Sequence, residues 1–111
     1  MIEFRAFFNC KATGESLSGD APSSVSTSGI CDIARRVMRE EGDFLGLVDS
    51  AGRVLQFRME GYRTVWMETP VPGERASYGR SVLLLDLLDV LRGLPSSFEL
   101  SRLGQLERHQ W

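Results

Sequence analysis

The fold is decided by residues 44–70, FLGLVDSAGRVLQFRMEGYRTVWMETP. Residues 44–48 form a nearly continuous apolar run, and residues 53–60 and 62–69 alternate between apolar and polar side chains with the period of a β-strand. The short segments between these runs are rich in Gly, Asp and Ser, which favour tight turns. The stretch therefore predicts three strands joined as an antiparallel β-meander.

Flanking segments extend the predicted sheet. Residues 2–8 alternate in the same way and predict a strand before the meander. Residues 76–81 predict a further strand after Pro70 and Pro72, which cannot donate to a sheet and therefore end the preceding strand. The sheet is thus expected to contain four or five strands.

Helical spacing of apolar residues occurs in two segments. Residues 30–41 predict an amphipathic helix with Ser28 as its N-cap, because a serine side chain can accept from the first free backbone N–H groups. Residues 82–94 carry a leucine stripe and predict a second helix. A short final helix over residues 97–108 is also expected, with a final strand as the alternative.

These elements predict an α+β fold of one domain, residues 1–111. The expected architecture is an antiparallel β-meander sheet of four or five strands with two or three helices packed on one face, a two-layer sandwich. Residues 11–29 are expected to form a long flexible loop, because this segment consists mostly of small and polar residues.

Composition limits the functional classes. The 111 residues are 42% hydrophobic and 25% charged, as in ordinary globular domains. The formal net charge of −2 makes a nucleic-acid partner unexpected, because such binders need a basic excess. The sequence shows no signal peptide and no long apolar run, so a cytoplasmic location without a membrane partner is expected. Cys10 and Cys31 could meet in space, although two reduced, partly buried side chains are the expectation.

Catalytic chemistry finds little support in the sequence. The single histidine, His109, lies near the C-terminus, where chains are usually mobile, so a base for a serine or cysteine nucleophile is not evident. Potential metal ligands are not clustered at ligand spacing. We therefore assign no catalytic residue, no metal site and no cofactor, and an enzyme is the least expected class.

The most suggestive feature is the polar face of the meander near the Gly61 turn. Tyrosine, tryptophan and arginine are enriched at interface hot spots, and all three gather there. The alternative is that the aromatic residues belong to the core and the arginines face solvent. The candidate binding residues are Arg58, Tyr62, Arg63, Trp66, Tyr78 and Arg80.

In size and element order the chain resembles small bacterial α+β proteins that bind one protein partner, including immunity proteins that neutralise a toxin. The resemblance implies an accessory or immunity-type function, and it carries over no residue. The leading hypothesis is a non-enzymatic protein-binding module whose partner is another protein or a second copy of the chain. The alternative is a small-ligand or anion-binding domain in which Arg58, Arg63 and Arg80 converge on a pocket.

Overall fold

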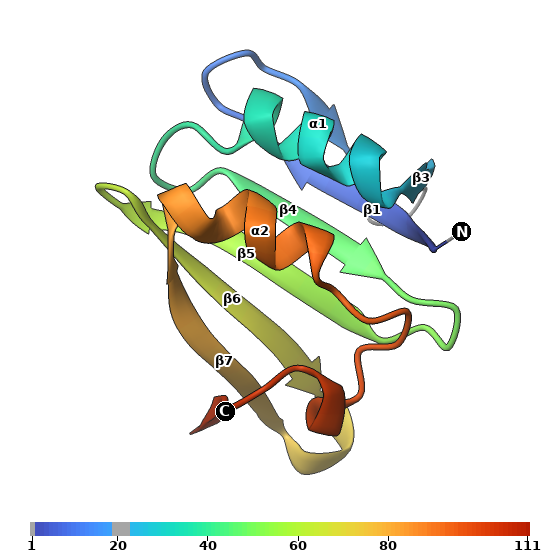
Figure 1. Ribbon diagram of the computed structural model, residues 1–111. Helices are drawn as coiled ribbons and strands as arrows, with labels where there is room; N and C mark the ends of the chain where they lie inside the picture. Colours follow the sequence, from blue (N-terminus) through green and yellow to red (C-terminus); the bar gives the residue numbers. More distant parts are fainter. Residues whose placement is uncertain (1, 19–22) are drawn as a thin grey trace.

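The computed structural model describes residues 2–18 and 23–111, and in this part of the chain eight strands form one antiparallel sheet. The strand order is β2-β1-β4-β5-β6-β7-β8, and β3 also pairs with β1. Figure 1 shows both α-helices on the same face of this sheet. The strands are β1 (Glu3–Asn9), β2 (Ser16–Leu17), β3 (Ser23–Ser26), β4 (Phe44–Val48), β5 (Val54–Gly61), β6 (Thr64–Val71), β7 (Ala76–Leu83) and β8 (Glu107–Gln110).

The helical elements are few and short. They are α1 (Thr27–Val37), α2 (Leu87–Arg92) and the 3-10 turns η1 (Pro72–Glu74), η2 (Leu84–Asp86) and η3 (Leu100–Arg102). The α+β class is therefore confirmed, but the sheet has more strands than the four or five expected. The additional strands, β2, β3 and β8, are too short to show an alternating pattern in the sequence. None of the described helices is long and apolar enough to cross a membrane.

Helix α1 begins and ends earlier than its apolar spacing predicted. The Ser26 side chain, not that of Ser28, caps the helix by accepting a hydrogen bond from the backbone N–H of Gly29 at 3.3 Å. The helix ends at Val37 rather than residue 41. The backbone N–H groups of Arg39 and Glu40 donate to the Asp43 carboxylate, and that of Arg39 also lies 3.1 Å from the Val37 carbonyl oxygen, so neither continues the bonding pattern of the helix to the carbonyl four residues earlier.

The two predictions for the C-terminal half need larger corrections. The expected helix over residues 82–94 was too long, because Val82 pairs with Val65 in the sheet and β7 continues to Leu83. The expected helix over residues 97–108 was wrong, and the alternative of a final strand is confirmed by β8, which follows the left-handed Gly104 (φ 84°).

The segment 11–29, expected to be a long flexible loop, contributes regular structure where it is described. Strand β2 pairs with the end of β1, β3 pairs with its beginning, and α1 starts at Thr27. Residues 19–22 of this segment lie outside the described residues. Cys10 and Cys31 are both buried and free.

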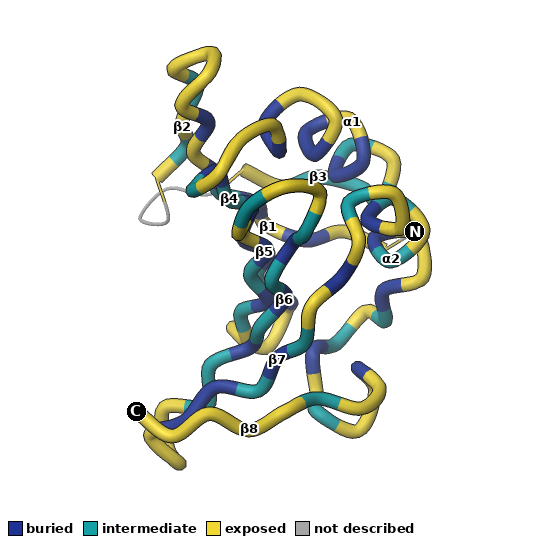
Figure 2. The backbone as a smooth tube through the Cα atoms, turned by 90° about the vertical axis from the view of Figure 1, so that its left-hand side faces the viewer, coloured by how far each residue is buried: buried dark blue, intermediate teal, exposed yellow. Residues whose placement is uncertain are grey.

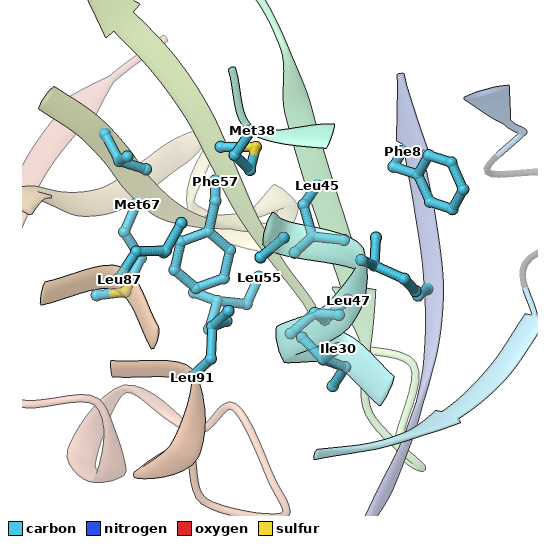
Figure 3. Close-up of a cluster of buried hydrophobic side chains, with 14 of the residues drawn as sticks. Phe8, Ile30, Met38, Leu45, Leu47, Leu55, Phe57, Met67, Leu87 and Leu91 are labelled. Carbon is cyan, nitrogen blue, oxygen red and sulfur yellow. The ribbon is translucent and has the colours of Figure 1, made fainter. Parts of the chain in front are cut away.

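The hydrophobic core lies between the sheet and the two helices. Figure 3 shows Leu45, Leu55 and Phe57 of the sheet facing Ile30 of α1 and Leu91 of α2. All five side chains are completely buried. Burial of a large apolar side chain stabilises a fold by roughly 1.5–3 kcal/mol, so this layer fixes the helices on one face.

A buried carboxylate holds the start of β4. Asp43 accepts hydrogen bonds from the backbone N–H groups of Lys11 (2.8 Å), Arg39 (3.1 Å) and Glu40 (2.8 Å). Burial opposes ionisation of Asp43, but these hydrogen bonds together outweigh burial and lower its pKa from the ordinary value. Asp43 therefore joins the end of β1, the end of α1 and the start of β4.

A second buried carboxylate holds the other end of β4. Asp49 accepts from the backbone N–H groups of Ala51 (2.9 Å), Arg53 (2.8 Å) and Phe98 (2.8 Å). Burial again opposes ionisation, and the hydrogen bonds from Phe98, Arg53 and Ala51 lower the pKa of Asp49. The bond from Phe98 also anchors the chain after α2 to the turn that follows β4.

Candidate functional site: the uncovered face of the sheet

One face of the sheet carries no helix in the described part of the chain. Figure 2 shows the sheet from its edge, with α1 and α2 together on one side of it. We call the opposite side the open face. Its central residues are Phe7, Phe44, Gln56, Arg58, Trp66 and Glu68, which alternate along their strands with side chains buried in the core.

The open face is hollowed between aromatic rings. A groove of about 250 Å³ lies over the middle of the sheet. Phe7 and Phe44 form one wall and Trp66 forms the other, with polar side chains between them. We call this hollow the aromatic groove. It is lined by Phe7, Phe44, Gln56, Phe57, Arg58, Trp66 and Glu68.

Two strand glycines leave space for the rings of the two walls. A Cβ atom at Gly46 would come within 2.1 Å of the Phe7 ring, and a Cβ atom at Gly79 would come within 2.7 Å of the Trp66 ring. Glycine weakens a strand, and within a strand it often marks the close approach of another group. Here the space left by each missing side chain is filled by an aromatic ring from the neighbouring strand.

Each wall is supported by further contacts. The Phe7 ring meets Phe44 edge-on with centroids 5.9 Å apart, and the Trp66 ring meets His109 edge-on at 5.3 Å. The Trp66 indole N–H also donates to the Glu68 carboxylate at 3.0 Å. The rings are thus held in place before any partner arrives, which lowers the entropic cost of binding.

Arg58 stands in the middle of this surface. It pairs across the strands with Phe44 on one side and Trp66 on the other. Its side chain is exposed and makes no hydrogen bond or ion pair with any residue in 2–18 or 23–111. A free guanidinium next to aromatic rings offers five N–H donors to a carboxylate or carbonyl oxygen.

The structure brings only two of the six sequence-predicted binding residues into the groove. Arg58 and Trp66 lie there as cross-strand neighbours, and Trp66 is half-buried on the open face rather than in the core. Tyr62 and Arg63 lie on the β5–β6 turn, where the Arg63 guanidinium sits 4.8 Å from the centre of the Tyr62 ring. Tyr62 is 84% exposed there.

The remaining two predicted residues lie on the helix side of the sheet. Arg80 is the cross-strand partner of Met67, whose side chain belongs to the core. The Tyr78 hydroxyl donates to the Glu74 carboxylate at 2.6 Å, and this bond raises the pKa of Tyr78. Arg58, Arg63 and Arg80 therefore lie in three different places and do not form the common pocket that the alternative hypothesis required.

Sequence reasoning missed several residues of the groove, and some signals for them were present. Phe7 interrupts the alternation of residues 2–8 with an aromatic side chain at a polar position. Gly46 and Gly79 interrupt strands, which can mark a close approach. His109, expected near a mobile chain end, is instead placed in β8 opposite Ser77, on the side of the sheet that carries Trp66.

The fold and the groove define an α+β sandwich with one aromatic, uncovered sheet face. Comparison of the chain with protein-family models, with curated proteins and with solved structures found no match.

Proposed function

We propose that this chain is a non-enzymatic protein-binding domain, and that the partner docks on the open face around the aromatic groove. The observation that carries the proposal is the preformed pair of aromatic walls, seated on Gly46 and Gly79, with the free Arg58 between them. Tryptophan and arginine at the centre of a surface are the residue types that most often dominate the binding energy of an interface.

The composition of the open face supports a protein partner. A sheet face in contact with water normally carries polar side chains. Here half-buried apolar side chains extend beyond the groove, and an apolar surface rimmed by polar residues is typical of interaction sites. The apolar side chains of the open face include Phe7, Phe44, Val48, Val54, Trp66 and Pro70.

The test compares the wild-type chain with two groove variants and one variant outside the groove as affinity baits. Tagged wild-type chain, Arg58→Ala, Trp66→Ala and Arg63→Ala are used to capture proteins from a lysate of the source cell, and bound proteins are identified by mass spectrometry. Arg58→Ala and Trp66→Ala should lose at least tenfold in binding, which corresponds to about 1.4 kcal/mol. Arg63→Ala should bind like wild type, because Arg63 lies on the turn outside the groove.

The result that would overturn the proposal is equal capture by all four baits, with each variant shown to be folded by circular dichroism. In that case the partner does not contact the groove.

A small-ligand site is the second candidate function, because the groove places the free Arg58 among aromatic side chains. About 250 Å³ between aromatic walls is slightly below the usual range for ligand pockets, about 300–1,000 Å³. Arg58 would select a planar or apolar ligand that carries a carboxylate. Thermal-shift screening with small aromatic carboxylates separates this function from protein binding, since Arg58→Ala should abolish any stabilisation.

A further inference from the structure

We infer that the aromatic groove binds a free aromatic amino acid as its zwitterion, with the carboxylate on Arg58 and the ammonium group on Glu68. This inference goes beyond protein binding and names a ligand class for the small-ligand site considered above. Two features of the groove carry it. The groove is lined by one guanidinium and one carboxylate that are not paired with each other, and its apolar side chains are aromatic.

The two charges lie close enough to share one head group. Among the described residues, only Arg58 and Glu68 line the groove with charged side chains. Arg58 lies opposite Trp66, and Glu68 lies two residues further along β6. Such diagonal neighbours are about 7–8 Å apart across a strand pair. A head group that carries both charges on one carbon atom, as an amino acid does, can therefore reach both side chains at once.

The Glu68 carboxylate is held in place and still has acceptor capacity. Its Oε2 atom accepts from the Trp66 indole N–H at 3.0 Å, and no described residue donates to Oε1. A carboxylate offers about four acceptor sites, so Glu68 can accept from an ammonium group without releasing Trp66. Gln56 lies directly opposite on β5, and its amide makes no side-chain hydrogen bond to a described residue. Gln56 therefore offers one more polar contact to the head group.

The charge of the open face favours a zwitterion over a simple anion or cation. Counted along its strands, the face carries four carboxylates and two guanidinium groups, so it disfavours a small organic anion. Arg58 inside the groove disfavours a simple cation in turn. A ligand with no net charge and one charge of each sign avoids both penalties. The charged residues of the face outside the groove are Glu3, Arg5, Glu60 and Glu107.

The aromatic walls select the side chain of the ligand. Phe44 stands on β4 and Trp66 on β6, two strands that are separated by β5 and therefore about 10 Å apart. The Phe7 ring covers Gly46 beside Phe44. One further ring fits between such walls in the offset or edge-to-face arrangement that aromatic rings prefer. The volume of about 250 Å³ suits a single amino acid, because the usual range of about 300–1,000 Å³ applies to larger, drug-sized ligands.

The test is an NMR titration of the full chain at neutral pH with phenylalanine and three analogues. The indole N–H signal of Trp66 reports the groove, and that of Trp111, which does not line it, is the internal control. Phenylalanine should bind with a Kd of about 1 mM or tighter. Phenylpropionate lacks the ammonium group, phenylethylamine lacks the carboxylate, and alanine lacks the ring. Each analogue should bind at least about tenfold more weakly, because each leaves part of the site without a partner.

Matched pairs of variant and analogue assign each charge. Arg58→Gln should weaken phenylalanine binding at least about tenfold and leave phenylethylamine binding unchanged, because that analogue has no carboxylate. Glu68→Gln should weaken phenylalanine binding likewise and leave phenylpropionate binding unchanged. Its amide oxygen still accepts from the Trp66 indole, so the wall keeps its support. Arg5→Gln and Glu3→Gln change the same charges outside the groove and should bind phenylalanine like wild type.

Three results would overturn the inference. An unchanged Trp66 indole signal at about 20 mM phenylalanine, well above the expected Kd, shows that the groove takes no amino acid. Equally tight binding of N-acetylphenylalanine, whose nitrogen is uncharged as in the last residue of a protein chain, shows that Glu68 recognises no ammonium group. Unchanged binding in both Arg58→Gln and Glu68→Gln, each shown to be folded by circular dichroism, places the ligand elsewhere. The capture experiment uses no amino acid, so the proposed protein-binding function stands or falls separately.

Discussion

The Trp66 ring lies directly over Gly79 of the neighbouring strand, in space that any other residue's side chain would occupy. A Cβ atom at position 79 would stand 2.7 Å from the indole and 2.5 Å from the Met67 carbonyl oxygen. One wall of the aromatic groove therefore depends on a residue with no side chain.

Gly79→Ala should destabilise the chain by about 1–3 kcal/mol, because the added methyl group forces the ring or the strand to move. The measurement is urea unfolding at neutral pH. Gly61→Ala is the matched control, since nothing lies within 4 Å of a Cβ at that position at the end of β5, and it should change stability little. Equal effects of the two substitutions would contradict the account of the Trp66 wall.

The other wall makes a different prediction, because the atoms nearest to a Cβ at Gly46 all belong to the Phe7 ring. Gly46→Ala alone should cost about 1–3 kcal/mol, and Phe7→Ala alone a similar amount. The double variant should cost at least about 1 kcal/mol less than the sum, because removing the ring removes the clash.

The same comparison of single and double variants at Trp66 and Gly79 should give a smaller coupling energy, because the Met67 backbone oxygen still lies close to a Cβ atom at position 79. Urea unfolding of all single and double variants measures both coupling energies. Additive effects at Phe7 and Gly46 would show that the ring does not occupy the position described.

The two buried aspartates predict loss of stability in acid. Their folded-state pKa values lie below the ordinary value, so their contribution is fully present above the unfolded-state pKa of about 4 and is lost as pH falls through the lowered pKa. Asp43→Asn should destabilise the chain at pH 7 by about 2–4 kcal/mol, because its amide group cannot accept all the backbone N–H bonds.

Asp43→Asn should also flatten the dependence of stability on pH below 5, measured as the free energy of unfolding in urea. Asp86→Asn serves as the control, because Asp86 is exposed and makes no side-chain bond to a described residue. A pH profile of Asp43→Asn parallel to that of wild type would show that Asp43 does not carry the acid sensitivity.

Removal of residues 107–111 should expose the Trp66 wall, because it deletes His109 from the edge of the ring. This truncation also deletes Trp111 and leaves Trp66 as the single tryptophan. Its fluorescence should be quenched more strongly by acrylamide than that of full-length Trp111→Phe, the matched variant. Equal quenching would mean that β8 does not protect the indole.

Local pattern is sufficient to predict part of this surface. The alternation of residues 53–60 and 62–69 places Arg58 and Trp66 on one face, because the period of two is a property of the extended backbone itself. The same reasoning cannot bring Phe7 to the groove. Its position depends on β1 pairing with β4, a contact between distant segments that no local pattern specifies.

For the residues around 82–85, the local sequence pattern itself is ambiguous. A run of apolar residues fits a helix and a buried strand equally well, and here pairing with β6 decides in favour of the strand up to Leu83. Arg80 and Tyr78 could not be assigned to a face from composition alone. Their register with Met67 and Thr69 places them on the helix side.

The close approach of an aromatic ring to Gly46 and to Gly79 also limits which substitutions this sequence can accept during evolution. Glycine at 46 is required only while an aromatic ring stands at 7, so the two positions should be inherited as a pair and be lost as a pair. At 79 the strand carbonyl adds its own restriction, so glycine there should outlast any replacement of Trp66. In divergent descendants of this chain, positions 7 and 46 should therefore covary strictly and positions 66 and 79 less strictly. Whether these pairs are kept would indicate whether the open face was kept for a partner.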